Sequence, residues 1–311
     1  MISLVAGGAG FLGSHLCEAL LREGRQVVCV DNLATGRYAN IEPLTDCRAF
    51  TFIEADVTHE FDVEGPVSHV FNLASPASPV AYLELPVETL MCGSVGTFNL
   101  LRLADRKDAH FILASTSEVY GDAAVHPQPE SYFGNVNPTG PRSVYDEAKR
   151  FAEALTFAFH RAGRARVAIA RIFNTYGPRM RPDDGRVVST FIEQALAGKA
   201  LTVHGSGDQT RSLCFVDDTV DGMLRLRNAG CTGPLNIGND FETTVREIAE
   251  KVIELTGSGS LIEFVQPVAE SPRHRRPDLH EMRKTLGWAP RVSVEEGLRW
   301  TIAWHRAAGA G

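Results

Sequence analysis

The sequence has 311 residues, a length that suits two domains of roughly 150 residues each. Apolar residues make up 44% of the chain and charged residues 22%, ordinary values that exclude a disordered, collagen-like or coiled-coil protein. The formal net charge of −7 argues against a nucleic-acid-binding protein, because a polyanion requires a broad basic surface.

Short apolar runs alternate with segments of helical spacing in the N-terminal part of the chain. The runs predict strands at residues 2–6, 26–30, 50–53, 67–73, 110–114 and 166–172. The helical spacing predicts helices at residues 11–22, 87–105 and 145–162. This alternation predicts an α/β fold with a doubly wound parallel sheet, because the crossover helices of parallel strands cover both of its faces.

The pattern becomes shorter and less regular after residue 178. Helices are predicted at residues 187–197, 217–227, 244–255 and 294–308, and strands at 201–204 and 235–237. We therefore predict a large domain of residues 1–178, which also takes in part of 213–238. A second, smaller α/β domain of residues 179–311 is expected to bind substrate.

A glycine cluster follows the first predicted strand and opens the first predicted helix, with glycines at Gly7, Gly10 and Gly13. Such a loop lets the backbone approach a pyrophosphate, and the helix N-terminus stabilises its charge. Asp31 closes the second strand, where a carboxylate accepts hydrogen bonds from ribose hydroxyls and repels a 2′-phosphate. The first domain is therefore predicted to bind a dinucleotide, with NAD favoured over NADP although Arg37 lies nearby.

Tyr145 and Lys149 lie four residues apart on a predicted helix, a spacing that places both side chains on one face. An ammonium beside a phenol lowers the phenol pKa, so that the tyrosine can act as a base toward a hydroxyl group. Residues 115–118 add three hydroxyl groups and an acid at the end of the preceding strand, where a doubly wound sheet binds its ligands. The sequence therefore predicts a catalytic site at this edge.

Several motifs together resemble the extended short-chain dehydrogenase/reductase superfamily, a group with a Rossmann fold. They are GGAGFLG at 7–13, STSEVYGD at 115–122, YDEAK at 145–149 and RIFNTYGPR at 171–179. A second set is similar to the UDP-glucuronate decarboxylase (UDP-xylose synthase) family within it. This set is LASPASP at 73–79, NPTGPRSVYDEAKR at 137–150, DDGRVVSTFI at 183–192 and LTVHGSGDQTRS at 201–212.

The resemblance implies that bound NAD is used catalytically: C4 of UDP-glucuronate is oxidised, CO2 is lost, and C4 is reduced again to give UDP-xylose. It implies that Tyr145 is the base and that Lys149 tunes its pKa and binds the ribose. Thr116 is expected to bond the C4 oxygen, with Ser117 and Glu118 near C5 and the carboxylate. Arg211 is expected to contact the substrate and to supply the C5 proton.

The expected cofactor-binding residues are Gly7, Gly10, Phe11, Leu12, Gly13, Asp31, Asn32, Asp56, Val57, Leu73, Tyr145 and Lys149. The expected substrate-binding residues are Pro79, Tyr82, Asn174, Arg186, Val187, Thr202, Val203, Arg211 and Arg276. Among Arg273, Arg275 and Arg276, the resemblance selects Arg276 for the diphosphate. The chain departs from the family at Asn72, where histidine is usual, and at Gly93, where asparagine is usual.

Other functions remain open at this point. A UDP-glucuronate 4-epimerase needs no acid where Glu118 stands, and a 4,6-dehydratase usually has an aspartate where Ser117 stands. Early release of the reduced cofactor would give a 4-keto pentose as product. A non-catalytic NAD-sensing scaffold would be expected to lose Tyr145 or Lys149, and both are present.

No apolar stretch approaches the roughly 18 residues of a membrane span, and no signal peptide is recognised, so no membrane partner is expected. The six cysteines form no CxxC pair and the histidines have no metal-binding spacing, so no metal site is predicted. Free thiols indicate a reducing compartment, and we expect a cytoplasmic protein. The apolar stripes of helices 87–105 and 145–162 match the superfamily's dimer helices and predict a homodimer.

Overall fold

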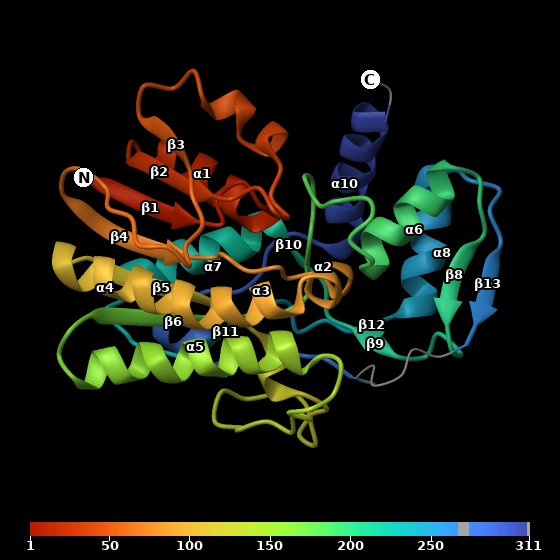
Figure 1. Ribbon diagram of the computed structural model, residues 1–311. Coiled ribbons are helices and arrows are strands. Elements are labelled where there is room, and N and C mark those ends of the chain that lie inside the picture. The colour runs from red at the N-terminus through yellow and green to blue at the C-terminus, as the bar shows by residue number, and fades with distance from the viewer. Residues whose placement is uncertain (267–273, 310–311) are drawn as a thin grey trace.

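A computed structural model describes residues 1–266 and 274–309 (Figure 1). Its centre is a seven-stranded sheet with the order β11-β6-β5-β4-β1-β2-β3, in which every neighbouring pair is parallel. The strands are β1 (Ile2–Ala6), β2 (Gln26–Asp31), β3 (Phe50–Glu54), β4 (Val67–Asn72), β5 (His110–Thr116), β6 (Arg166–Ile172) and β11 (Leu235–Ile237). The predicted doubly wound parallel sheet is confirmed.

Helices cover both faces of this sheet (Figure 1). One face carries α1 (Phe11–Arg22) and α7 (Val216–Asn228), which pack against each other. The other face carries α3 (Pro86–Met91), α4 (Thr97–Lys107) and α5 (Ser143–Arg161). The single helix predicted at 87–105 is divided into α3 and α4 by a π-helical turn at Cys92–Gly96. Strands β1, β2, β5 and β6 are almost wholly buried, because their apolar side chains meet a helix on either side. The edge strand β3 is only partly buried.

A smaller layer of elements lies beside the carboxyl ends of the strands (Figure 1). It contains the helices α6 (Val187–Leu196), α8 (Val245–Thr256) and α10 (Val294–Gly309), and the parallel pair β8 (Leu201–His204) and β13 (Ile262–Val265). Short pairs join β7 (Thr175–Tyr176) to β10 (Cys214–Phe215) and β9 (Thr210–Arg211) to β12 (Thr243–Thr244). The chain returns to the large sheet at α7 and β11, within the stretch 213–238.

The elements not predicted from the sequence include α2 (Pro79–Glu84), β13, α9 (His280–Leu286) and the two-residue strands β7, β9, β10 and β12. Each is short, and β13 is only partly buried, so its apolar pattern is weak. In the described part of the chain, no helix is long and apolar enough to cross a membrane.

Candidate active site

A large cavity opens between the two layers, at the carboxyl ends of the central strands. All twelve residues predicted to bind the cofactor line it, as do all six predicted catalytic residues. The walls therefore bring together side chains from the glycine loop, from the ends of β2 and β5, from α5 and from the smaller layer.

The glycine loop leaves no room for side chains. A Cβ on Gly13 would lie 2.0 Å from the carbonyl oxygen of Gly7, and one on Gly7 would lie 2.7 Å from the backbone nitrogen of Ala74. Gly7 also has a positive φ of 76°, which L side chains rarely adopt. The helix α1 that follows has no side-chain cap and no acidic residue in its first turn. Its N-terminal N–H groups thus fit a bound phosphate group.

Asp31 and Asp56 lie beyond this loop. The Asp31 carboxylate accepts hydrogen bonds from the backbone nitrogens of Ala9 and Leu33, both at 2.9 Å, and burial raises its pKa. Burial also opposes ionisation of Asp56, but hydrogen bonds from Thr58 and Asn32 outweigh it and hold the pKa of Asp56 below its ordinary value. The glycine loop and the N-terminus of α1 together form a phosphate cradle, and Asp31 and Asp56 lie beyond it. This arrangement fits a dinucleotide whose pyrophosphate lies on the loop and whose free ribose hydroxyls face a carboxylate.

Tyr145 and Lys149 are both buried on α5. The Lys149 ammonium donates a 2.9 Å hydrogen bond to the carbonyl oxygen of Ala114 and lies 5.8 Å from the centre of the Tyr145 ring. The expected lowering of the phenol pKa is not found, because burial and the negative charge of Glu118 raise the pKa of Tyr145. Burial lowers the pKa of Lys149 to about 8, so its ammonium is itself poorly solvated.

The end of β5 presents Thr116, Ser117 and Glu118 to the cavity. The Thr116 hydroxyl accepts a 3.2 Å hydrogen bond from the Glu118 backbone nitrogen and so begins the 3-10 helix η4 (Ser117–Tyr120). Although burial opposes ionisation of Glu118, Arg275 and Arg142 bind its two carboxylate oxygens and lower its pKa to about 2. Glu118 is therefore a carboxylate in this site.

Arg275 is a site residue that sequence reasoning missed. It lines the cavity and donates a 3.1 Å hydrogen bond to Glu118, whereas Arg276 is absent from the wall. Adjacent side chains of an extended segment point in opposite directions, and the Arg276 guanidinium lies 3.8 Å from Glu242 instead. The basic stretch at 273–276 is the sequence feature that indicates this part of the site, but the resemblance pointed to Arg276 instead of Arg275. Arg273 lies outside the described residues.

Two further predicted substrate contacts do not line the cavity. Val203 is completely buried, because side chains alternate along β8 and its neighbours Thr202 and His204 are the ones that face the cavity. Tyr82 lies beneath Tyr145, with the two rings stacked at 5.3 Å between centroids. The remaining predicted substrate-binding residues are on the wall: Pro79, Asn174, Arg186, Val187, Thr202 and Arg211.

Arg211 adds a third guanidinium to the group around Glu118, beside Arg142 and Arg275. Its Nη1 donates a 2.7 Å hydrogen bond to the carbonyl oxygen of Thr210. Burial, together with the positive charges of Arg275 and Arg142, lowers the pKa of Arg211 to about 10. This part of the cavity is consequently rich in positive charge and suited to an anionic ligand.

The departures at Gly93 and Asn72 have local explanations. A Cβ on Gly93 would lie 2.7 Å from the Cβ of Ala148 and 2.9 Å from its carbonyl oxygen, so no larger residue fits where α5 crosses the π-helical turn. Asn72 donates a 3.1 Å hydrogen bond to the Thr97 hydroxyl. Gly93 thus lets α5 pack closely on the π-helical turn, and Asn72 links the end of β4 to the first residue of α4.

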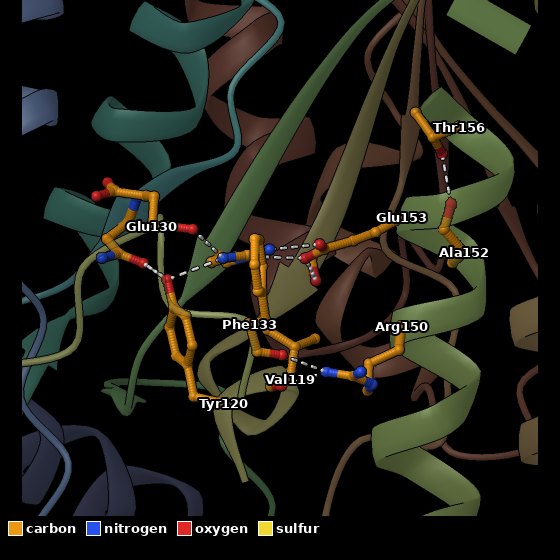
Figure 2. Close-up of polar contacts among 11 residues, drawn as sticks. Val119, Tyr120, Glu130, Phe133, Arg150, Ala152, Glu153 and Thr156 are labelled. Carbon is orange, nitrogen blue, oxygen red and sulfur yellow. Dashed lines mark hydrogen bonds and ion pairs between the residues drawn. The ribbon is translucent and has the colours of Figure 1, made fainter. Parts of the chain in front are cut away.

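A buried polar network lies next to the catalytic edge, and Figure 2 shows its part around Tyr120 and Glu153. Arg171 binds Glu153 through two hydrogen bonds of 2.9 and 2.7 Å, and Ser115 donates one of 2.6 Å to the same carboxylate. Arg171 also donates to the Tyr120 hydroxyl, which in turn donates to Asn236. The network thus joins β5, α5, β6 and β11 directly behind the catalytic edge.

Comparison with known proteins accounts for this combination of glycine loop, buried tyrosine–lysine pair and two-layer cavity. A family model described as the NAD dependent epimerase/dehydratase family matches residues 3–238. The chain belongs to this family. NAD is accordingly its cofactor, in agreement with the phosphate cradle and the two carboxylates.

Within this family, curated relatives are similar over almost the whole chain. The UDP-glucuronic acid decarboxylase 3 of Arabidopsis thaliana is 51% identical over 296 residues, which are 95% of this chain and 86% of that protein. The UDP-glucuronic acid decarboxylase 1 of Xenopus tropicalis is 47% identical over 97% of this chain and 72% of that protein.

Solved structures of two UDP-sugar epimerases are also similar. The UDP-glucose 4-epimerase of Thermotoga maritima, solved with UDP-glucose, superimposes with a TM-score of 0.91 at 31% identity, covering 99% of each chain. The UDP-glucuronic acid 4-epimerase of Bacillus cereus, solved with UDP-glucuronic acid and NAD, gives a TM-score of 0.87 at 27% identity, covering 99% of this chain and 100% of that one.

Proposed function

We propose that this member of the family is a UDP-glucuronate decarboxylase that forms UDP-xylose. The observation that carries the proposal is Glu118, a carboxylate held between Arg142 and Arg275 on the cavity wall beside Tyr145. A carboxylate between two arginines at this point would act on C5 of the sugar and on the substrate carboxylate. An epimerase changes only C4 and needs no such groups near C5. The identity of about half of all residues to curated decarboxylases supports the same assignment.

The glycine loop, Asp31 and Lys149 would hold NAD, which would supply hydride chemistry at C4 of the sugar, first as acceptor and then as donor. Burial raises the pKa of Tyr145 in the protein alone, so it can act as the base for the C4 hydroxyl group only once the positive charges of the Lys149 ammonium and of bound NAD stabilise its phenolate. The Thr116 hydroxyl would hold the C4 oxygen in place. Lys149 stays buried beneath the tyrosine, where a cofactor ribose can replace part of its lost hydration. The C4 ketone then lies β to the carboxylate, so that loss of CO2 leaves a delocalised enolate.

The substrate is a small polyanion, and the arginines on the wall provide its counter-charges. Arg186 and Arg211 line the part of the cavity formed by the smaller layer, where we place the diphosphate and uracil of the nucleotide. Arg186 is held by a 2.7 Å hydrogen bond to the carbonyl oxygen of Ala77 and by Asp184. We propose that Pro79, Asn174, Val187 and Thr202 complete this subsite.

The experiment is incubation with UDP-glucuronate without added NAD, followed by NMR of the products and measurement of released CO2. UDP-xylose with one equivalent of CO2 is expected, because the cofactor is regenerated in each cycle. UDP-galacturonate would overturn the proposal in favour of epimerisation, and an accumulating 4-keto pentose would show that the reduced cofactor leaves early. A Tyr145→Phe variant serves as the control for hydride chemistry.

We further propose that the protein works as a homodimer. The outward faces of α3, α4 and α5 lie on one side of the molecule (Figure 1) and carry exposed apolar side chains: Val87, Leu90, Met91, Phe98 and Phe151. Burial of such a patch against a second copy stabilises association. Sedimentation equilibrium of the wild type should show a dimer, and Phe151→Glu should dissociate it; a wild-type monomer at micromolar concentration would refute this.

The predicted cytoplasmic location also belongs to the proposal. Its support is that Cys17, Cys29, Cys47, Cys92, Cys214 and Cys231 are all free thiols, which are typical of a reducing compartment. Microscopy of the tagged full-length chain tests it, and a signal confined to an oxidising compartment would contradict it.

A further inference from the structure

Asp146 is a buried carboxyl group that the chemistry above does not use. It follows Tyr145 on α5, is 6% exposed, and turns toward the carboxyl group of Glu118 on η4. Its Oδ1 atom is buried and has no hydrogen-bond partner among the described residues. Buried polar atoms are nearly always paired, so an unpaired carboxyl oxygen beside a catalytic edge requires an explanation.

The charges around the two carboxyl groups decide how many protons they hold. Arg142 and Arg275 both direct their ion pairs to Glu118, so Glu118 is the ionised member. Burial and the negative charge of Glu118 raise the pKa of Asp146 to about 8. The positive charges of Arg142 and Arg275 oppose this rise in the pKa of Asp146 but do not outweigh it. The phenols of Tyr82 on α2 and Tyr145 on α5 also face Asp146 and are uncharged in the protein alone. The pair therefore holds one proton near neutral pH, on Asp146.

The proposed reaction needs such a proton. When the C5–C6 bond breaks, its electron pair stays on the sugar as an enolate and CO2 leaves. One proton must then be added to C5, and neither UDP-glucuronate nor the hydride cycle supplies it. Arg211, to which the resemblance gives this role, keeps its proton up to a pKa of about 10 and is a weaker acid than a carboxyl group.

We propose that the Glu118–Asp146 carboxyl pair stores the proton that is added to C5 after CO2 leaves; this inference rests on the proposed function. Asp146 does not line the cavity, whereas Glu118 does, so the proton passes from Asp146 to Glu118 and from Glu118 to C5. The pair then carries two negative charges, which Arg142, Arg275 and Arg211 balance until one proton returns from solvent. Asp146 thus acts through Glu118.

The test compares Asp146→Asn with wild type in D2O. The asparagine keeps the size of the side chain, and its amide N–H can be donated toward the Glu118 carboxylate, but it cannot release a proton. Wild type should place deuterium on one face of C5, whereas Asp146→Asn should label both faces, because water then protonates the enolate. UDP-xylose formation should fall about 100-fold, within the range for loss of a general acid, while the first turnover still releases CO2.

The pH profile gives an independent readout. The wild-type rate should fall above pH 8 as the pair loses its stored proton. This fall of the rate above pH 8, the alkaline limb of the profile, should be absent in Asp146→Asn and present again in Asp146→Glu. Glu147→Gln is the matched control, because Glu147 is the next residue of α5 but pairs with Arg150 at 3.6 Å, away from the cavity.

The outcomes separate this inference from the function on which it rests. Single-face labelling and an unchanged alkaline limb in Asp146→Asn, with normal CO2 release, would overturn the proton store alone. Absence of CO2 with wild type would overturn the decarboxylase assignment itself. Loss of the alkaline limb in Arg211→Lys but not in Asp146→Asn would assign the proton to the arginine and refute the proposal.

Discussion

Replacement of Glu153 by glutamine tests how much the buried network of Figure 2 contributes to stability. The side chains of Arg171 and Glu153 are only 12% and 11% exposed, and two hydrogen bonds join them. Glu153→Gln leaves the Arg171 guanidinium buried without a counter-charge. Removal of one partner of such a pair costs about 3–5 kcal/mol. At about 2 °C per kcal/mol for a chain of this size, the melting temperature should fall by about 6–10 °C.

The assay is differential scanning calorimetry of wild type and variant under identical buffer conditions. The matched control is Asp105→Asn, which removes a similarly short pair to Arg164, with an Nη2–Oδ2 distance of 2.7 Å. That pair is 47% and 31% exposed, so water screens it and its loss should cost about 0–1 kcal/mol. Equal shifts in the two variants would refute the reasoning, because burial would then not be the cause of the loss.

Three other predictions concern the site. Gly13→Ala forces a Cβ to within 2.0 Å of backbone and should abolish NAD binding measured by calorimetry, whereas Gly259→Ala, with open space around it, should bind normally. Tyr145→Phe should lower CO2 release at least 100-fold with little change in melting temperature; near-normal turnover would exclude the tyrosine as the base. Folding raises the pKa of Asp146 to about 8, so protonation of this carboxyl group stabilises the folded protein. That stabilisation is complete below about pH 4 and is lost as the pH rises through about 8. The melting temperature of wild type relative to Asp146→Asn should therefore fall across this range.

The local parts of the fold could be predicted because their physical causes are local. The sequence contains the strand, the glycines and the helix start within residues 2–22, and the spacing of apolar residues shows which faces are buried. The buried side chains of β5 and β6 likewise follow from continuous apolar runs. Short elements such as α2 and α9 carry too few residues for a periodicity to be recognised.

The chemistry of the site depends instead on groups that are distant in the chain. Glu118 and Arg275 are separated by 157 residues, and the direction of one extended segment decides that Arg275 rather than Arg276 reaches the carboxylate. The same holds for the pKa of Tyr145. The YxxxK spacing alone predicts that this pKa falls, whereas burial raises it.

The sequence by itself determined the fold class, the phosphate cradle and the positions of Tyr145 and Lys149, because each depends on short-range geometry of the backbone. Only the tertiary structure decided which arginines surround Glu118 and that the pKa of Asp146 is raised. Those properties are set by desolvation and by charges from separate elements, which a linear pattern does not contain.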